Sequence, residues 1–282
     1  MQLAVSRSAT YAGLAADDVG RSDERPPLVL LHGLTFDRQM WGPALAELET
    51  IDPGRRAIAI DLPGHGSSPD APSYMLEALV ERVHAAVEDA GLVDPVLVGH
   101  SAAAGTAFLY GVMHPSRGVV AVEGTLRVGP FGAMARSMEL ALRGPGFAEA
   151  FGRVLASAFQ LDQVTPDVRA FVDATSKPRQ EVVLGYWQAL FQFAPDELDA
   201  MVAKGASAIR ASGLPFMSVL GRDPSSEDLA WIAANLPAMR VEVWPQSGHF
   251  PHLAHPRQFA ELLAETGRWR GRSVEPVAAG SV

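Results

Sequence analysis

A serine on a sharp turn is the strongest chemical signal in the chain. Ser101 lies in the segment VGHSAA (98–103), between a buried apolar strand and a predicted helix that begins near Ala102. A serine on such a strand-to-helix turn is exposed at the carboxyl end of a sheet. The free N–H groups and the dipole at the start of the helix favour negative charge there. A serine can also simply cap a helix, so the turn alone predicts either a nucleophile or an N-cap.

A second turn is expected to face this serine. The segment LLHGLT (30–35) follows the first buried strand, so the backbone N–H of Leu34 can point towards the same place. Together with the N–H of Ala102, it would form an oxyanion hole, which stabilises the negatively charged oxygen formed in acyl transfer. The alternative is that His32 and Gly33 only shape a tight turn.

A serine nucleophile needs a base, and His249 is the best placed of the eight histidines. The segment QSGHFP (246–251) follows the last predicted strand, so its loop opens at the same edge of the sheet as Ser101. His252 and His255 lie nearby, but prolines separate the three histidines, and they do not share one helix face as metal ligands often do. We therefore expect no metal and no other cofactor.

A carboxylate should hold the imidazole in one tautomer and stabilise its protonated form. Asp223 stands just after a predicted strand, and the chain order Ser101, Asp223, His249 is the order expected for a triad on this kind of sheet. Glu123 ends the preceding strand at the same edge and stays open as the alternative acid. Asp228 is a third candidate, interpreted as a charge in the first turn of a helix.

Buried strands that alternate with helices must position these residues. Apolar runs without polar alternation indicate strands covered on both faces, and apolar residues at helical spacing indicate the helix of a crossover. With right-handed connections, this pattern predicts an α/β fold with a doubly wound, mostly parallel sheet. The predicted strands span 27–31, 57–60, 95–98, 119–122, 215–220 and 240–244, and the predicted helices include 74–90, 226–235 and 256–265.

The segment between 124 and 212 lacks any strand signal but is rich in aromatic residues. We expect it to form a helical cap inserted into a core made of residues 1–123 and 213–271, followed by a flexible tail at 272–282. The aromatic residues favour an apolar substrate, because ligand cavities are mostly apolar. The alternative is that most of these rings form the cap's own core.

Taken together, the segments resemble the α/β-hydrolase superfamily, in particular its capped esterase-like and lipase-like members. The resemblance implies a serine hydrolase that cleaves an ester, thioester or lactone of a small, largely apolar substrate through an acyl-enzyme. Two departures are visible: Ala103 replaces the usual elbow glycine, and one residue instead of two separates Gly221 from Asp223. The second departure keeps Glu123 open as the acid. The motifs that carry the resemblance are HGLT (32–35), DLPGHGSS (61–68), GHS (99–101), GRD (221–223) and SGHFP (247–251).

Composition narrows the range of partners. The 282 residues are 48% hydrophobic and 20% charged, with no cysteine and a formal net charge of −9. Disulfides and thiolate sites are therefore excluded, and the acidic balance disfavours nucleic acid and anionic membrane surfaces as partners. With no signal peptide pattern at the start of the sequence, we expect a cytoplasmic monomer or homodimer that acts on a small molecule.

Two other functions fit the same residues. Some relatives with this fold are lyases, cyclases or perhydrolase-like enzymes that use the triad as an acid–base site without an acyl-enzyme. A small-molecule receptor is the second alternative, in which the cap would signal to a partner protein. Detection of an acyl-enzyme would separate hydrolysis from the first alternative, and tight binding with very slow turnover would mark the second.

Overall fold

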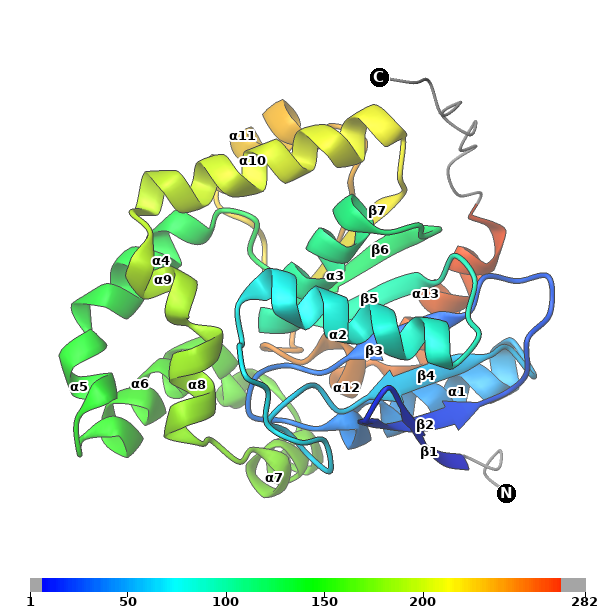
Figure 1. Ribbon diagram of the computed structural model, residues 1–282, viewed down its shortest axis with the longest axis horizontal. Helices are drawn as coiled ribbons and strands as arrows, with labels where there is room; N and C mark the ends of the chain where they lie inside the picture. Colours follow the sequence, from blue (N-terminus) through cyan, green and yellow to red (C-terminus); the bar gives the residue numbers. More distant parts are fainter. Residues whose placement is uncertain (1–6, 270–282) are drawn as a thin grey trace.

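The computed structural model describes residues 7–269 of the chain and contains one eight-stranded sheet (Figure 1). The strands lie in the order β1-β2-β4-β3-β5-β6-β7-β8; β2 pairs antiparallel with β1 and β4, and all other neighbours are parallel. The predicted doubly wound, mostly parallel sheet is thus confirmed. The strands are β1 (Arg7–Tyr11), β2 (Leu14–Val19), β3 (Leu28–Leu31), β4 (Ala57–Ile60), β5 (Val96–His100), β6 (Gly118–Val122), β7 (Phe216–Leu220) and β8 (Arg240–Val243).

Helices cover both faces of the sheet, which explains the continuous apolar strands. Successive side chains of a strand point to opposite faces. Val29 and Leu31 accordingly belong to the apolar cluster beneath α2 and α3, whereas Leu28 and Leu30 belong to the cluster beneath α1 and α13. The covering helices are α2 (Leu76–Asp89), α3 (Ala102–Met113) and α11 (Ser226–Asn235) on the first face, and α1 (Gly42–Ile51), α12 (Pro251–Ala254) and α13 (Pro256–Glu265) on the second.

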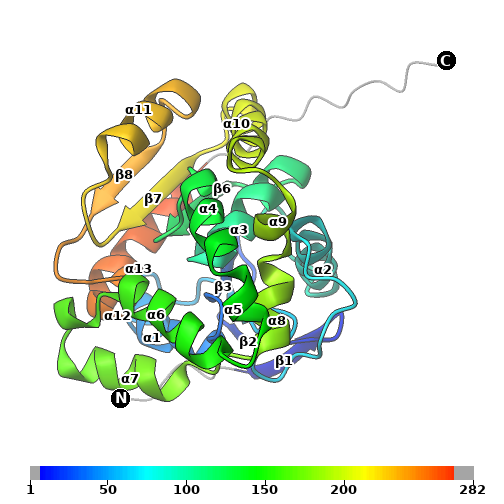
Figure 2. The ribbon, with the colours of Figure 1, turned by 90° about the vertical axis from the view of Figure 1, so that its left-hand side faces the viewer.

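Only helices and turns form between β6 and β7, a segment that the structure describes throughout. In Figure 1 most of these helices gather beyond one end of the sheet, and Figure 2 shows them in front of the strand ends. They enclose an apolar cluster of their own, which includes Phe151, Trp187 and Leu190. The helices are α4 (Val128–Ser137), α5 (Glu139–Arg143), α6 (Phe147–Phe159), α7 (Pro166–Thr175), α8 (Gln180–Tyr186), α9 (Gln188–Gln192) and α10 (Pro195–Ser212).

The last of these helices packs partly on the sheet. Ala206 and Ile209 of α10 belong to the same apolar cluster as α2 and α3. The part of α10 that packs on the sheet therefore begins before residue 212, where we expected the cap to end. The expected tail at 272–282 lies outside the described residues, and no helix within 7–269 is long and apolar enough to cross a membrane.

The buried side chain of Arg55 links the residues just before β3 to the end of α13 by hydrogen bonds. The Arg55 guanidinium donates to the carbonyl oxygens of Pro26 and Leu263, at 2.9 and 2.6 Å, and to the Thr266 hydroxyl at 2.9 Å. Burial lowers the pKa of Arg55, but its partners compensate by accepting several charge-assisted hydrogen bonds.

Replacing Arg55 with alanine should lower the free energy of unfolding by about 3 kcal/mol or more, because buried acceptors lose their charged donor. Urea denaturation followed by circular dichroism would measure the loss. The matched control is Arg240→Ala: this side chain is 48% exposed, and within residues 7–269 its ion-pair partners are Glu242 and Glu265. We expect the control to cost under about 1 kcal/mol, as exposed ion pairs usually do. Equal losses in the two variants would contradict a structural role for Arg55.

Candidate functional site

Ser101 occupies a strained turn between β5 and α3. Its backbone lies at φ 55° and ψ −121°, and its N–H donates to the carbonyl of Val122 at 2.8 Å. A side chain on Gly99 would overlap the backbone carbonyl of Ala103, so the turn needs glycine before it. The Ser101 hydroxyl makes no capping bond to the helix, although the residue occupies the N-cap position. Its oxygen is instead directed to a histidine.

Glu123 stands at the corresponding point of the next strand, β6. Its N–H donates to the carbonyl of Val219 at 2.9 Å, which continues the parallel ladder one residue beyond the strand. The backbone then turns at φ 52°, in the left-handed region that non-glycine residues seldom adopt. One carboxylate oxygen, Oε1, accepts the N–H of Gly221, and the other, Oε2, faces His249.

His249 connects the serine to this carboxylate. Its Nε2 lies 2.9 Å from Ser101 Oγ, and its Nδ1 lies 3.1 Å from Glu123 Oε2. A carboxylate accepts hydrogen bonds but donates none, so the ring proton belongs on Nδ1 and Nε2 is left to accept the serine hydroxyl. The side chains of His249 and Glu123 are each 12% exposed, so water competes little for these hydrogen bonds.

The structure brings Glu123, and not Asp223, to the histidine. Asp223 is exposed and makes no hydrogen bond or ion pair with another residue in the described range 7–269. Its strand, β7, lies one position further from β5 than β6 does, and the loop after β7 approaches Glu123 through the Gly221 N–H instead. The expected contact between Asp223 and His249 is therefore absent from the described range, and the geometry favours Glu123, the alternative acid.

Two groups hold the backbone of His249 from opposite sides. The ring of His100 donates from Nε2 to the His249 carbonyl at 2.8 Å, and the His249 N–H donates to the carbonyl of Phe159 at 3.1 Å. The Phe159 ring also stacks on the imidazole, with centroids 5.7 Å apart. At the neighbouring Gly248, with φ 50°, any side chain would press on the carbonyls of Phe159 and Gln160. His249 is therefore held through its main chain as well as through its ring.

The turn after β3 lies against the serine. A methyl group built on Gly33 would stand 3.4 Å from Ser101 Cβ. The Gly33 carbonyl accepts the N–H of Phe36 at 3.2 Å and the ring N–H of His32 at 2.8 Å. Because a trans peptide places C=O and N–H on opposite sides, these bonds turn the Leu34 N–H the other way. Within the described chain, that N–H donates to no other group.

The N–H of Ala102 is similarly unused. The first N–H groups of a helix have no intrahelical acceptor, and Ala102 is the first residue of α3. No described residue accepts from it, and the residue itself is exposed. The two N–H groups expected to stabilise an oxyanion, those of Leu34 and Ala102, are thus both free to bind a ligand.

Two uncharged histidines brace the turn that contains Leu34. His32 accepts the Leu62 N–H at 2.9 Å, and His65 accepts the Thr35 N–H at 3.2 Å. Burial lowers the pKa of His32 to about 4 and, together with the neighbouring His32, lowers the pKa of His65 to about 3. Both rings are therefore neutral near pH 7 and can accept one hydrogen bond and donate another.

The third acidic candidate, Asp228, is engaged away from His249. It pairs with Arg127 at 3.2 Å and accepts the Ser225 hydroxyl at 2.7 Å in the capping box of α11. This agrees with the interpretation of Asp228 as a first-turn charge. No group of three histidine or acidic side chains within 7–269 is arranged to hold a metal ion.

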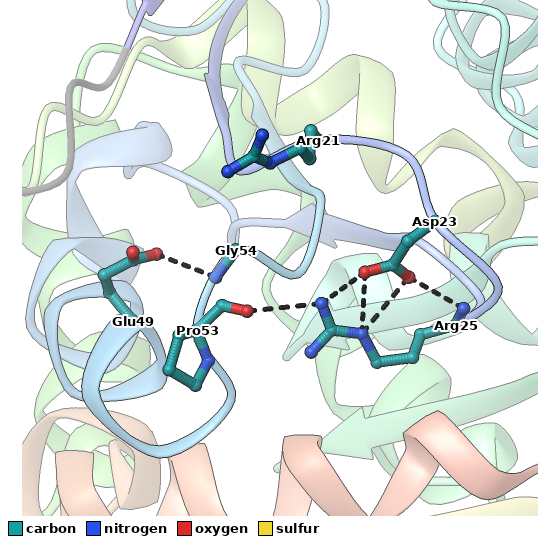
Figure 3. A pocket seen from close by; sticks show the side chains of 6 residues that line it. All are labelled: Arg21, Asp23, Arg25, Glu49, Pro53 and Gly54. Atoms are coloured by element: carbon teal, nitrogen blue, oxygen red, sulfur yellow. Dashed lines mark hydrogen bonds and ion pairs between the residues drawn. The ribbon is translucent and has the colours of Figure 1, made fainter.

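A separate surface hollow of about 360 Å³ lies at the opposite edge of the sheet (Figure 3). Its residues precede β3 and β4, whereas Ser101 follows the carboxyl end of β5. In Figure 3 the Arg25 guanidinium is directed at Asp23, so this charge is already neutralised within the hollow. The hollow offers no nucleophile and no base, and we assign it no role. It is lined by Arg21, Asp23, Arg25, Glu49, Pro53 and Gly54.

Comparison with known proteins identifies the family. The model of the "Alpha/beta hydrolase family" matches residues 28–262, which is most of the chain. The chain belongs to the alpha/beta hydrolase family. This alpha/beta hydrolase is 27% identical over 257 residues to the sn-1-specific diacylglycerol lipase ABHD11 of Mus musculus, covering 84% of this chain and 80% of the relative. The predicted family, with its esterase-like and lipase-like relatives, is confirmed.

Another relative of this hydrolase is named as a synthase and not as a lipase. The chain is 26% identical over 254 residues to a 2-succinyl-6-hydroxy-2,4-cyclohexadiene-1-carboxylate synthase of Serratia proteamaculans, covering 85% of this chain and 92% of the relative. Among solved structures, the enol-lactonase of Burkholderia xenovorans LB400 superposes with a TM-score of 0.68 at 20% identity, covering 92% and 99% of the two chains. That likeness shows the shared fold.

Two residues that hold His249 in place were not predicted from the sequence. His100 stands next to Ser101 at the end of β5, and that position is a signal that places it near the site. Phe159 carried no such signal, because only the folded path of the insertion brings its carbonyl and ring to His249.

A fully buried histidine lies behind the site. His252 is 0% exposed, and neither of its ring nitrogens has a hydrogen-bond partner among the described residues. Its ring centroid is 4.7 Å from those of both His100 and Trp41. Burial lowers the pKa of His252 to about 3, well below the value of about 6.5 for an exposed histidine.

This shift makes stability depend on pH. Between pH 6.5 and 3 the unfolded state binds a proton at residue 252 that the folded state excludes, so the contribution is full above pH 6.5 and is lost as the pH falls. His252→Leu should reduce the slope of unfolding free energy against pH by about 1.4 kcal/mol per pH unit between pH 4 and 5.5. Urea denaturation across this range would measure it.

The matched control is Phe259→Leu, in the same cluster but without a titrating group. It should lower stability at every pH and leave the slope as in the wild type. A slope in His252→Leu equal to that of the wild type would show that residue 252 takes up its proton in the folded state.

Proposed function

We propose that this protein is a serine hydrolase that cleaves an ester, thioester or lactone of a small, largely apolar substrate through an acyl-enzyme. One observation carries the proposal: the unbroken series of hydrogen bonds from Ser101 Oγ through the imidazole of His249 to Glu123. This arrangement supplies a nucleophile, a base and an orienting carboxylate in the relation that acyl transfer requires.

The first step uses the hydrogen bond between Ser101 and His249. As Ser101 Oγ forms a bond to the substrate's carbonyl carbon, its proton passes to His249 Nε2, and the carbonyl electron pair moves to oxygen. Glu123 stabilises the resulting imidazolium through Nδ1. The carbonyl then re-forms, the bond to the leaving group breaks, and the leaving atom takes the proton from Nε2. Water repeats the sequence on the acyl-enzyme and releases the acid.

The negative oxygen of the intermediate needs donors that are already in place. The N–H groups of Leu34 and Ala102 have no acceptor within the described chain, and they belong to the two turns that meet at Ser101, which supports this role. Preorganised N–H donors of this kind commonly contribute most to the stabilisation of the intermediate, because they need no reorientation during the reaction.

The surroundings of the site support an apolar acyl group. The Phe159 ring stacks on His249, and Leu34 packs against the apolar cluster of the insertion. We propose that the helices of this insertion act as the cap over the site. The relatives include a lipase that acts on a diacylglycerol and, at the level of the fold, an enol-lactonase, and both names denote cleavage of an ester bond.

A second candidate is a reaction without an acyl-enzyme, in which His249 and Ser101 act only as a base and a proton carrier. The similarity to a cyclohexadiene-carboxylate synthase over 85% of this chain supports this second candidate. Incubation with a p-nitrophenyl ester followed by intact-mass measurement separates the two. An acyl adduct on Ser101 supports hydrolysis, and turnover of a synthase substrate with no adduct from any ester supports the alternative.

Ser101→Ala should lower kcat for a short p-nitrophenyl ester by about 10⁴–10⁶-fold, because the nucleophile and its base act as one unit. Stopped-flow kinetics on the wild type should show a burst of p-nitrophenol that the variant lacks. The control is Ser137→Ala, an exposed serine of α4 remote from this contact series. Near-wild-type turnover in Ser101→Ala would end the proposal of serine catalysis.

Glu123→Gln should lower kcat by about 10⁴-fold, because an amide at Nδ1 no longer fixes the tautomer or stabilises the imidazolium. Asp223→Asn is the matched control, since it makes the same chemical change at the other acid considered, and we expect kcat within about twofold of the wild type. If kcat on the same ester fell more in Asp223→Asn than in Glu123→Gln, Asp223 would be the acid that orients His249.

A further inference from the structure

The two loops that carry the reacting groups are both bound by one segment of the insertion. The carbonyl of Phe159 accepts the N–H of His249 at 3.1 Å at one end of this segment. At the other end, the N–H of Lys177 donates to the carbonyl of Thr35 at 2.8 Å, and the Ser176 hydroxyl lies 3.0 Å from Thr35 Oγ1. Residues 159–177, which contain α7, therefore reach from the base to the residue that follows Leu34.

This segment packs with the sheet and not with the rest of the insertion. Phe159 and Val172 are buried in the apolar cluster beneath α1 and α13, which also contains Phe36 and Phe250. Leu161, Val168 and Phe171 pack against the same cluster, whereas the helices α4, α5, α8 and α9 contribute to the separate one. These five side chains attach the segment to the sheet layer at several points along its length.

Thr35 needs such a support. Its φ of 76° lies in the left-handed region, which is a genuine outlier for a β-branched residue and persists only where surrounding contacts enforce it. His65 accepts its N–H, and the two remaining polar groups of Thr35, its carbonyl and its hydroxyl, are both held by residues 176 and 177. Without residues 176 and 177, the bond to His65 would be the one contact left to these polar groups of Thr35 among the described residues, although the Gly33 carbonyl would still hold the start of the turn.

We propose that residues 159–177 form a positioning strap that holds the oxyanion turn and the His249 loop in register, so that the catalytic site is assembled only when the strap is in place. The proposal rests on the serine hydrolase function proposed above. Ser176 and Lys177 are positioning residues, because they touch Thr35 and no reacting atom. The strap stays seated on the sheet while substrates pass beneath the other helices of the insertion.

Lys177→Pro tests the strap by removing one N–H. Ser176 has ψ 119°, an extended conformation that a following proline accepts. The proline ring takes the place of the N–H, so the substitution removes the donor and displaces the Thr35 carbonyl from residue 177. We expect kcat on a p-nitrophenyl ester to fall about 10- to 100-fold with KM changed less than about threefold, because donors misplaced by a fraction of an ångström lose mainly transition-state binding. Lys177→Ala, which keeps the N–H, should restore most of kcat.

A second pair of variants addresses the hydroxyl contact. Thr35→Val and Ser176→Ala should each lower kcat, and the double variant should be no worse than the poorer single one, since both remove the same interaction. Arg127→Ala is the control for general attachment of the insertion: its ion pair with Asp228 joins the start of the insertion to α11 and involves neither Thr35 nor His249, and kcat should stay near the wild-type value.

Two further measurements distinguish failure of the strap from failure of the proposed function. A fluorophosphonate should label Ser101 in the wild type and more slowly in Lys177→Pro, while the melting temperatures of Lys177→Pro and Lys177→Ala should differ little. Equal kcat in Lys177→Pro and Lys177→Ala, or additive losses in Thr35→Val and Ser176→Ala, would overturn the strap. Absence of labelling in the wild type would instead overturn the proposed function.

Discussion

The carboxylate of Glu123 is the point at which three strand ends meet. It extends from β6, accepts an N–H from the loop after β7 and faces the ring that comes from beyond β8. A carboxylate with little exposure to water must be compensated by donors, and here both oxygens have one. Ser101 follows the neighbouring strand β5. Its N–H donates to the carbonyl of Val122, the residue just before Glu123. Loss of this charge would leave the His249 ring free to rotate or change tautomer.

Most of the fold could be predicted from the sequence, because buried parallel strands and amphipathic helices have distinct local patterns. Helix α13 begins at the expected Pro256, and α11 spans the expected 226–235. Helix α1 was not predicted. It begins with glycine and proline, and its amphipathic pattern is weak. Its stability comes from packing against α13, a contact between residues some 200 positions apart, which no local pattern reports.

The site was predictable only in part, for a related reason. Ser101, His249, Leu34 and Ala102 follow strands at one edge, and the edge follows from the order of the elements. The choice between Asp223 and Glu123 depends on which strand neighbours β5, and chain order does not contain that information. The contribution of Phe159 depends on the path of a long helical insertion, where periodicity gives helices but not their directions.

Three of the buried histidines near the site link backbone groups by hydrogen bonds while carrying no charge. His32, His65 and His100 each donate to a backbone carbonyl, and the first two also accept a backbone N–H. An arginine or lysine could only donate, and a carboxylate could only accept. Imidazole does both without a charge that the interior would have to solvate. Near neutral pH the turns around Ser101 therefore gain hydrogen bonds without added charge.

The separate apolar cluster of the insertion has an evolutionary consequence. Because Phe151, Trp187 and Leu190 pack among themselves, mutations there can reshape the insertion while leaving the sheet and its two clusters intact. Under the proposed function, selection for a new acyl group would therefore act on α4, α5, α8 and α9 almost as on an exchangeable module, with the residues around Ser101 unchanged.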